Sequence, residues 1–341
     1  MNTDKPLNMV DMVGVGLNAT DTVIALDRYP GQGAKLEFND LRVLPGGQVA
    51  STVAACQQWG LATRYVGKIG DDDAAELHRR EFARLGVDAQ LIAVPHCASR
   101  QSVILVDGDG ERTVLWRRDE RQNLHPGELR REWIEGARVL HLDGYDIAAA
   151  TLAAGWARAA GIPVVADLDE LYPGIDDLLS LTDYAIVSRD FPSRLTGETT
   201  LEAALKTMQR RYGAKLAAAT LGHDGVLAWD GEQFCYSNAF RVPVADTTGA
   251  GDIFHAGFIY GLLAAWPLQR QLEFASAAAA LNCSAIGARG GIAPVQEIEA
   301  LMSHAERHPS IRSDAGVTES ETRRPDRKGR NAWNKHLFGG V

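Results

Sequence analysis

The sequence predicts an α/β fold, a three-layer α/β/α domain with a mainly parallel sheet and a small antiparallel β sheet. From Arg138 onward, short apolar runs alternate with helical patterns, which is typical of parallel strands joined by right-handed crossovers. Earlier, two alternating segments flank the glycine-containing stretch from Asp107 to Glu111, and this pattern indicates an antiparallel hairpin. The chain of 341 residues is long enough for one large α/β domain or two average ones.

The first elements are strands, followed by one helix. The apolar run from Met9 to Leu17 predicts a buried strand that enters a tight turn at its glycines. The segments Asp21 to Leu26 and Lys35 to Val43 alternate in polarity and predict strands with one exposed face. The pair Gly46-Gly47 then begins a helix that continues through Trp59.

The next region completes the predicted antiparallel sheet. A strand from Thr63 to Val66 precedes a helix from Ala74 to Leu85, which a glycine ends. Strands Ser102 to Val106 and Arg112 to Trp116 then form the hairpin. An antiparallel sheet attached to a parallel α/β domain in this way would form a lid over a cleft, and we expect it from residues of about 20–45 and 98–120.

The second half of the chain supplies most of the parallel sheet. Its predicted strands are Val139 to Leu142, Pro163 to Ala166, Tyr184 to Val187 and Leu216 to Thr220. Helices are expected from Gly251 to Ala285 and from Pro294 to His304. Residues 308–341 are rich in charged and small residues and predict a disordered tail, which leaves a single domain at 8–307.

Composition excludes several classes of protein. The formal net charge of −9 does not favour nucleic acid or an anionic membrane surface as a partner. The four cysteines have no C-x-x-C spacing, so we expect neither a disulfide framework nor a zinc site. The N-terminus lacks a signal-peptide pattern, and no apolar stretch approaches membrane-spanning length. These features predict a soluble cytoplasmic protein.

The segment Asp246 to Asp252 carries the clearest chemical signal. It follows a β-like run from Arg241 to Ala245 and precedes a long helix. Its glycines, Gly249 and Gly251, permit unusual backbone conformations, so that the N–H groups of residues 249–251 converge at the helix N-terminus and bind an anion. Asp252 falls in the first turn, where its carboxylate can accept a proton from an attacking hydroxyl. The alternative is an ordinary helix cap with a glycine turn.

The whole pattern resembles the ribokinase-like (PfkB) carbohydrate kinases. The segment Asp246-Thr-Thr-Gly-Ala-Gly-Asp252 is similar to the C-terminal signature of that family. The pair Gly46-Gly47, together with Gly67-x-x-Gly70-Asp71-Asp72, is similar to its N-terminal signature. Together with Asp21 and the segment Thr220-x-Gly222-x-x-Gly225, these matches cover about residues 10–305 in the family order. The resemblance implies a ribokinase-like fold and ATP-dependent phosphorylation of a sugar.

The resemblance also implies roles for particular residues. Asp252 would be the catalytic base, with Gly249, Ala250 and Gly251 as the anion hole. Mg²⁺ would enter with ATP, held mainly by phosphates and water, and K⁺ is expected as a possible ion near Asp246 and Thr248. The residues expected to bind the sugar are Asn18, Asp21, Gly46, Gly47, Gln48 and Ser51. Those expected to contact ATP are Ser188, Thr220, Gly222, Gly225 and Asn282.

Within the family, the sequence looks nearest to the ketohexokinases and sulfofructose kinases. The segment Leu281-Asn282-Cys283 followed by Arg289-Gly290-Gly291-Ile292 is similar to their C-terminal segment, which predicts a ketose or a related sugar as substrate. Two departures alter the predicted substrate contacts. Gln48 and Ser51 occupy positions where sugar kinases commonly have Asn, although both can still hydrogen-bond a polyol.

Other functions remain open at this point. A nucleoside kinase of the same fold would stack a base on an aromatic lid residue, for which Trp116 is the obvious candidate. A non-catalytic sugar-binding regulator would not need Asp252, and a dinucleotide-dependent oxidoreductase would need a third glycine after Gly14-x-Gly16. Because the lid would expose a strand edge, we also expect a homodimer.

Several polar residues have two readings. The run Asp71-Asp72-Asp73 could bind a metal but is better explained as a helix cap. His255 is as compatible with a packed core histidine as with a substrate contact. Lys35 and Arg112 belong to the predicted lid, where a solvated strand charge is the simpler explanation for both.

Overall fold

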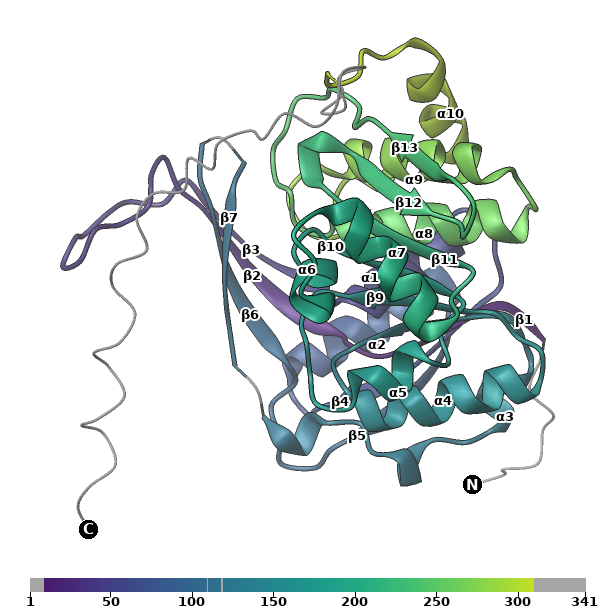
Figure 1. Ribbon diagram of the computed structural model, residues 1–341. Helices are drawn as coiled ribbons and strands as arrows, with labels where there is room; N and C mark the ends of the chain where they lie inside the picture. The colour runs from purple at the N-terminus through teal and green to yellow at the C-terminus, as the bar shows by residue number, and fades with distance from the viewer. Residues whose placement is uncertain (1–8, 109, 118, 310–341) are drawn as a thin grey trace. The chain divides into compact units, whose positions relative to one another are not determined.

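The structure is a computed structural model that describes residues 9–309, except 109 and 118. It confirms the predicted three-layer α/β/α fold with a large, mainly parallel sheet and a small second sheet (Figure 1). The predicted C-terminal tail lies outside the described residues apart from positions 308 and 309. Among the described helices, none combines the length and apolar character that crossing a membrane requires.

The main sheet has nine strands in the order β13-β12-β11-β10-β9-β8-β1-β4-β5. The strands from β11 to β5 in this order are parallel to their neighbours, and β12 and β13 are added antiparallel at one edge. In chain order they are β1 Val10–Val15, β4 Thr63–Ile69, β5 Asp88–Ala93, β8 Ala137–Asp143, β9 Val164–Leu168, β10 Tyr184–Ser188, β11 Leu216–Thr220, β12 Val226–Trp229 and β13 Phe234–Ser237.

The small sheet has four strands in the order β3-β2-β6-β7. Figure 1 shows these strands together at one side of the main sheet. They are β2 Ala19–Ala25, β3 Asp40–Gly46, β6 Gln101–Val106 and β7 Arg112–Trp116. The β6–β7 pair is antiparallel, as the hairpin pattern predicts, and the β2–β3 pair is antiparallel too. β2 and β6 pair in parallel because a crossover through the main domain separates them. We call this sheet the lid.

Helices cover both faces of the main sheet. One face carries α1 Gln48–Gln58, α2 Asp73–Leu85, α8 Ala250–Leu263, α9 Leu268–Asn282 and α10 Val295–His304. The other carries α3 Glu132–Glu135, α4 Ile147–Ala159, α5 Ile175–Leu179, α6 Phe191–Thr196 and α7 Leu201–Tyr212. Short 3-10 helices lie at Glu120–Gln122, Pro126–Glu128 and Gly222–Asp224.

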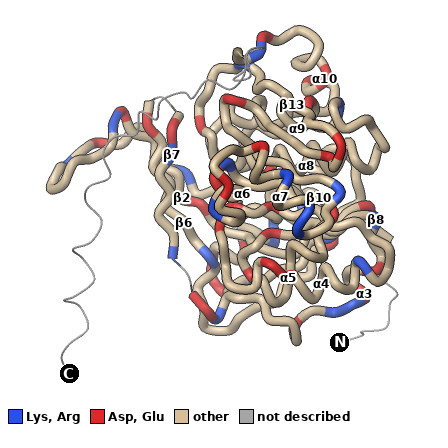
Figure 2. The backbone as a smooth tube through the Cα atoms, viewed as in Figure 1, with Lys and Arg blue, Asp and Glu red and all other residues tan. Residues whose placement is uncertain are grey.

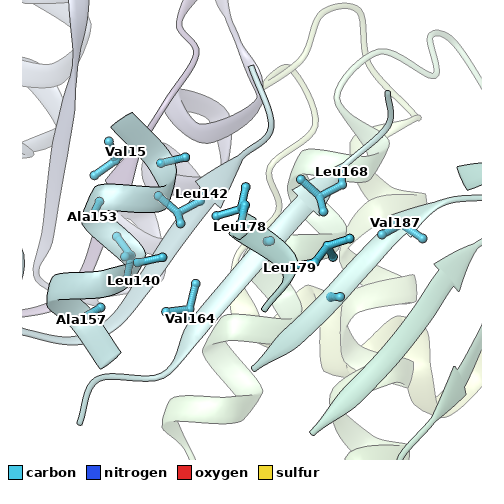
Figure 3. Close-up of a cluster of buried hydrophobic side chains, with 14 of the residues drawn as sticks. Val15, Leu140, Leu142, Ala153, Ala157, Val164, Leu168, Leu178, Leu179 and Val187 are labelled. Carbon is cyan, nitrogen blue, oxygen red and sulfur yellow. The ribbon is translucent and has the colours of Figure 1, made fainter. Parts of the chain in front are cut away.

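Because both faces are buried, the central strands read as continuous apolar runs, and alternate residues enter opposite cores. On β8, Val139 belongs to the core under α1 and α8, whereas Leu140 and Leu142 face α4 and α5. Figure 3 shows part of the second core, in which Leu140 and Leu142 lie near Ala153 of α4 and Leu178 of α5. In Figure 2, acidic and basic residues are interspersed along the described chain in this view.

Four sequence expectations need correction. The segment Arg241 to Ala245 is not a strand, because its last N–H and that of Asp246 donate to the Cys283 carbonyl at the end of α9. Residues 35–39 are a loop, so β3 starts only at Asp40. β4 continues beyond Val66 through Gly67 to Ile69. β5, β12 and β13 were missed: β5 and β13 are half-buried edge strands with a weak apolar signal, and β12, although buried, is only four residues long.

The expected helix from Ala74 to Leu85 is confirmed as α2, and its cap explains the acidic run before it. Asp72 is the N-cap residue and accepts a hydrogen bond from the Ala75 N–H at 3.0 Å. Its carboxylate also accepts the N–H and the hydroxyl of Ser99, which joins α2 to the start of β6. The observed N-cap at Asp72 therefore supports the helix cap as the explanation of this acidic run.

Candidate active site

The site forms where α8 meets the carboxyl ends of the parallel strands, which is where open α/β sheets place their ligands. The loop from Asp246 leads into α8, which begins at Ala250 with Gly249 as its N-cap. The first N–H groups of a helix lack partners within the helix, and its dipole adds partial positive charge there. The start of α8 is therefore suited to bind an anion such as a phosphoryl group.

The two glycines of this loop do different things. Gly249 has a φ of +77°, and a Cβ at this position would lie 2.3 Å from the Ala288 carbonyl oxygen, so only glycine fits. Gly251 adopts no such conformation, and a Cβ there would meet nothing within 4 Å. The expectation that both glycines serve unusual backbone conformations is therefore correct for Gly249 and wrong for Gly251. Gly251 instead leaves open space beside the first turn of α8.

Buried polar side chains fix the loop in place. Asp246 is fully buried and accepts hydrogen bonds from the N–H and the hydroxyl of Thr248, at 2.8 and 2.6 Å, and from the Gly287 N–H at 2.8 Å. Asn282, also fully buried, donates to the carbonyls of Thr248 and Ala288, each at 3.2 Å. The anion-binding loop is thus attached to the segment that follows α9.

Asp252 lies in the first turn of α8, partly exposed beside the open space at Gly251. Its backbone carbonyl accepts a hydrogen bond from the Thr52 hydroxyl of α1 at 3.0 Å, which ties α8 to α1. Burial, reinforced by the nearby carboxylate of Asp167, raises the pKa of Asp252 to about 8, although His255 and Arg112 act in the opposite direction. A carboxylate with such a pKa is a stronger base than an ordinary aspartate.

Further carboxylates with raised pKa values lie on the lid and at the carboxyl ends of the parallel strands. Burial raises the pKa of Asp21 on β2 to about 6 and that of Asp143 at the end of β8 to about 7. The pKa of Asp167 on β9 is raised well above its usual value by burial and by Asp169 and Asp143. Raised pKa values of this kind, at a ligand-binding edge, are typical of functional sites.

Asp21 is placed by the lid and by the glycine pair that precedes α1. Its carboxylate accepts a hydrogen bond from the Ser102 hydroxyl of β6 at 2.5 Å. A Cβ on Gly46 would lie 1.8 Å from the Asp21 carboxylate oxygen, and a Cβ on Gly47, whose φ is +93°, would lie 2.4 Å from the Asn18 Cα. The glycines therefore allow the start of α1 to approach the end of β1 and the start of β2.

The other residues predicted to bind sugar lie around Asp21 but differ in burial and in their hydrogen-bond partners. Asn18 is fully buried, and its amide donates to the Tyr65 hydroxyl and the Lys68 carbonyl, at 2.6 and 2.8 Å. Gln48 is partly exposed and donates to Asp169 at 3.3 Å. Ser51 is buried, and its hydroxyl accepts from Arg289.

Arg289 belongs to the site, although the sequence predicted no individual role for it. Its Nε donates to the Ser51 hydroxyl at 3.2 Å, and its Nη2 donates to the Gly46 carbonyl at 2.9 Å. It interacts electrostatically with both Asp21 and Asp252. No local pattern could have identified it, because it acts on residues more than 230 positions earlier in the chain.

Arg112 of the lid also belongs to the site, which corrects its reading as a solvated strand charge. Its Nη1 donates to the backbone carbonyl of Thr247 at 2.5 Å and contacts the Thr247 hydroxyl at 3.2 Å. That hydroxyl lies 3.4 Å from the Gly110 carbonyl in the lid hairpin. The lid therefore contacts the anion-binding loop directly, whereas Lys35 is exposed on the loop between β2 and β3.

Four of the five residues predicted to contact ATP lie at or just after the carboxyl ends of β10 and β11, whereas Asn282 ends α9. Ser188 ends β10 and Thr220 ends β11, and the two are paired in the sheet. Gly222 begins the 3-10 helix that follows β11. Gly225 has a φ of +92°, and a Cβ there would lie 2.0 Å from the Ser237 carbonyl oxygen, so this glycine lets the start of β12 lie close against the end of β13.

His255 is a packed interior residue. It is 2% exposed, and its Nδ1 and Nε2 lie 2.8 and 3.2 Å from the carbonyl oxygens of Gly251 and Ile186. Burial lowers its pKa. Its Nδ1 also lies 3.5 Å from the Asp167 carboxylate. Of the two interpretations from the sequence, a core histidine or a substrate contact, the structure supports the core histidine. It lies directly behind the turn that carries Asp252.

Comparison with known proteins agrees with this geometry. The pfkB family of carbohydrate kinases matches residues 15–295. An ATP-dependent ribose-1-phosphate kinase from Halopiger xanaduensis is 29% identical over 286 residues, which cover 82% of this chain and 94% of that protein. Ribokinases and other sugar kinases, rather than ketohexokinases, are prominent among such relatives, so the predicted subgroup stays a prediction.

Solved structures show the same fold. The crystal structure of an Agrobacterium tumefaciens protein assigned as a ribokinase superposes with a TM-score of 0.80 at 25% identity, covering 87% of this chain and 98% of that one. An Escherichia coli protein assigned as ribokinase II, solved with ATP and Mg²⁺, superposes with a TM-score of 0.75 at 19% identity, covering 86% of this chain and 99% of that one.

Proposed function

The chain belongs to the pfkB family of carbohydrate kinases, and we propose that it transfers the γ-phosphoryl group of ATP to a hydroxyl of a small sugar, with Asp252 as catalytic base. Membership makes it an ATP-dependent carbohydrate kinase, an alcohol phosphotransferase. The finer points, which are the sugar and the role of each residue, rest on the geometry of the site. We favour a ketose or related sugar, from the C-terminal segment at residues 281–292.

One observation supports the proposal above the others. A carboxylate of raised pKa, that of Asp252, lies in the first turn of a helix whose N-terminus is open for an anion. The N–H groups of Gly249, Ala250 and Gly251 stabilise the charge on the transferring phosphoryl group, and Asp252 accepts the proton of the attacking hydroxyl. The bond from the γ-phosphorus to the sugar oxygen forms as the bond to the β-phosphate bridging oxygen breaks, and ADP leaves.

Other residues position the two substrates. Asp21 binds a sugar hydroxyl, held in place by Ser102, while Gln48, Ser51 and Arg289 complete the sugar side. On the nucleotide side, ATP lies against Ser188, Thr220 and Gly222. Asn282 acts indirectly, because it hydrogen-bonds the loop before α8. The lid excludes water, which limits hydrolysis of ATP.

Mg²⁺ would enter with ATP, held mainly by the ATP phosphates and water, and would neutralise the phosphate charge. K⁺ is a separate proposal. Asp246 Oδ1 already accepts the N–H and the hydroxyl of Thr248, whereas Oδ2 accepts the Gly287 N–H and keeps a second lone pair with which it would bind K⁺. Activity in potassium chloride compared with tetramethylammonium chloride tests this point.

The proposed function is tested by ATP-dependent ADP release with ketoses, aldoses, sugar acids and nucleosides, with Asp252→Ala as control. We expect turnover of a sugar in the wild type and a loss of about 10²–10⁴-fold in the variant. Turnover in the variant within tenfold of wild type would contradict the role of Asp252. Turnover only with a nucleoside would replace the substrate class and retain the mechanism, and ATP binding without turnover would indicate a regulator.

We also propose a cytoplasmic homodimer that associates through the lid. The outer lid face, opposite Asp21, exposes Leu41, Val43 and Leu115 by 46%, 53% and 55%. Exposed apolar patches of this kind mark association surfaces. Light scattering at micromolar concentration should give twice the chain mass of 36.9 kDa, and Val43→Asp should lower it to one chain. A monomeric wild type would contradict the proposal.

A further inference from the structure

Two buried histidines lie side by side where α8 packs on the main sheet. His141 comes from β8 and His255 from α8, and their ring centroids lie 5.5 Å apart. His141 is 0% exposed and His255 is 2% exposed. Because neither ring faces solvent, the protein groups around each ring decide whether it carries one proton or two.

The surroundings of the two rings call for different numbers of N–H donors. His141 Nδ1 lies 3.2 Å from the Val165 carbonyl oxygen, and its Nε2 has no hydrogen-bond partner among the described residues. One N–H, as in a neutral imidazole, therefore suffices for His141. His255 has a carbonyl oxygen at each ring nitrogen, that of Gly251 at 2.8 Å from Nδ1 and that of Ile186 at 3.2 Å from Nε2. Carbonyl oxygens only accept hydrogen bonds, and only an imidazolium has an N–H at both nitrogens.

Asp167 supplies the negative charge that a buried imidazolium needs. Its side chain is buried, and its Oδ2 lies 3.5 Å from His255 Nδ1. Burial raises the pKa of Asp167 and lowers that of His255, so an isolated charge is disfavoured on either group. The pair then holds one mobile proton, which lies on the carboxylate or on the second ring nitrogen. The two carbonyl oxygens favour the ring, because a neutral His255 would direct a lone pair at one of them.

The other titratable groups around His255 favour a cation at this position. His141, from β8, stays neutral, since burial and the charge of His255 hold its pKa well below the usual value. Asp252, on α8 itself, favours the protonated form of His255. Asp169 and Asp143 raise the pKa of the carboxylate that faces the ring, and their negative charges also attract an imidazolium. The charged groups on the sheet side and on the helix side are therefore all acidic.

His255 reaches the anion-binding turn through one backbone peptide. The Gly251 carbonyl beside its Nδ1 belongs to the same peptide group as the Asp252 N–H. That N–H is among the first four of α8, which lack partners within the helix. A charged donor at the carbonyl polarises the peptide and makes its N–H a better donor to an anion. The second contact, to the Ile186 carbonyl, joins the same turn to β10, which ends at Ser188.

We propose that His255 is a positioning residue for phosphoryl transfer, held as an imidazolium by Asp167. In this form it braces the first turn of α8 against β10 and stabilises the ionised carboxylate of Asp252. The positive charge is enclosed in the protein and does not touch the substrate. This inference rests on the proposed function, in which Asp252 is the catalytic base.

NMR on the full chain tests the charge of His255 without any substrate. In protein that contains ¹⁵N-labelled histidine, His255→Gln identifies the His255 signals by their loss, and His255→Asn replaces it if the glutamine variant does not fold. At about pH 7.5, above the ordinary histidine pKa of about 6.5, both ring nitrogens of His255 should carry protons. His141 is the internal control of equal burial and should carry one. Asp167→Asn should make His255 neutral. A neutral His255 in the wild type, or a charged one in Asp167→Asn, overturns the inference.

A second measurement tests whether this charge acts on Asp252. Side chains three residues apart on a helix have Cβ atoms about 5–6 Å apart, and an opposite charge at that range lowers the pKa of a carboxyl group by about 1–3 units. The Asp252 pKa, followed by its ¹³C carboxyl signal, should therefore rise by about one unit or more in His255→Gln. The acid limb of kcat/KM should move by the same amount. His141→Gln removes an equally buried but neutral ring and should move neither.

The outcomes separate this inference from the proposed function. An Asp252 pKa that is the same in wild type and His255→Gln overturns the inference, even if the variant loses activity, because that loss would reflect a purely structural role. A raised Asp252 pKa in a protein without kinase activity supports the imidazolium beside Asp252 and contradicts the proposed function. A raised pKa with an unmoved acid limb does the same, because it shows that Asp252 is not the base.

Discussion

The two ends of the site are built in different ways. At the phosphoryl end, the anion-binding backbone and Asp252 come from seven consecutive residues, Asp246 to Asp252, at the start of one helix. At the sugar end, Asp21 is held by Ser102, and Ser51 is held by Arg289 from 238 positions away. The first end depends on local backbone geometry. The sugar end depends on contacts between the lid, α1 and the segment after α9. Its residues can therefore change with the substrate while those of the phosphoryl end are kept.

The largest expected effect comes from a substitution that distorts the backbone of the phosphoryl end. Gly249→Ala places a Cβ 2.3 Å from the Ala288 carbonyl at a φ of +77°, so the loop must move. We expect kcat to fall by about 10²–10³-fold, as when an oxyanion-hole donor is removed, and the melting temperature to fall as well. Steady-state kinetics and thermal denaturation measure the two effects.

Gly251→Ala is the matched variant for this prediction, because its Cβ would meet nothing within 4 Å. It should leave the melting temperature unchanged and raise KM for ATP, since the methyl group enters the space that the phosphates need. Equal losses of stability in the two variants would show that both glycines serve the backbone.

A smaller effect is expected at the sugar end, which is assembled from distant segments of the chain. Arg289→Gln removes the donors to Ser51 and Gly46. Hydrogen bonds from a charged group contribute about 1.5–3 kcal/mol, so KM for the sugar should rise about tenfold or more while KM for ATP stays within about twofold. Initial-rate kinetics with each substrate varied in turn measure both constants, and circular dichroism confirms folding. A parallel rise in both KM values would contradict the division of the site into two ends.

A pH profile tests whether the lid, through Arg112, acts on the proposed base Asp252. Asp252 works as a base only when ionised, and its pKa of about 8 predicts that kcat/KM is lost as pH falls below that value. The positive charge of Arg112 lowers this pKa, so Arg112→Gln should move the acid limb to higher pH. Arg42→Gln, which removes a lid charge paired with Asp40, should not move it. An unchanged limb in Arg112→Gln would show that the lid does not act on the base.

The smallest expected effect concerns stability. The folded-state pKa of Asp252 is raised above its ordinary value of 3.8 to about 8, so ionisation of this group destabilises the fold progressively as pH rises from about 4 to about 8. Asp252→Asn removes that penalty. Differential scanning calorimetry should show that the variant gains melting temperature over wild type, and gains more at pH 8 than at pH 5. A gain that is independent of pH would contradict the raised pKa.

The sequence is informative where neighbouring residues make the structure. The helix cap at Asp72, the glycine at Gly249 and the apolar runs of β8 to β11 are decided by local sterics, local hydrogen bonds and burial on both faces, so each is visible in a short window. These signals predicted the layers, the hairpin of the lid and the loop before α8. They failed for β5 and β13, which are half-buried at the edges of the sheet, and for β12, which is buried but only four residues long.

The sequence by itself therefore determined the fold class, the family resemblance and the phosphoryl end of the site. Only the tertiary structure showed that Arg289 reaches Ser51, that Arg112 contacts the loop before α8, and that Trp116 meets Tyr145. The physical reason is sequence separation. Each of these contacts joins elements that come together only when the lid packs on the main domain and the strands align, and no local pattern records which distant side chains will then be neighbours.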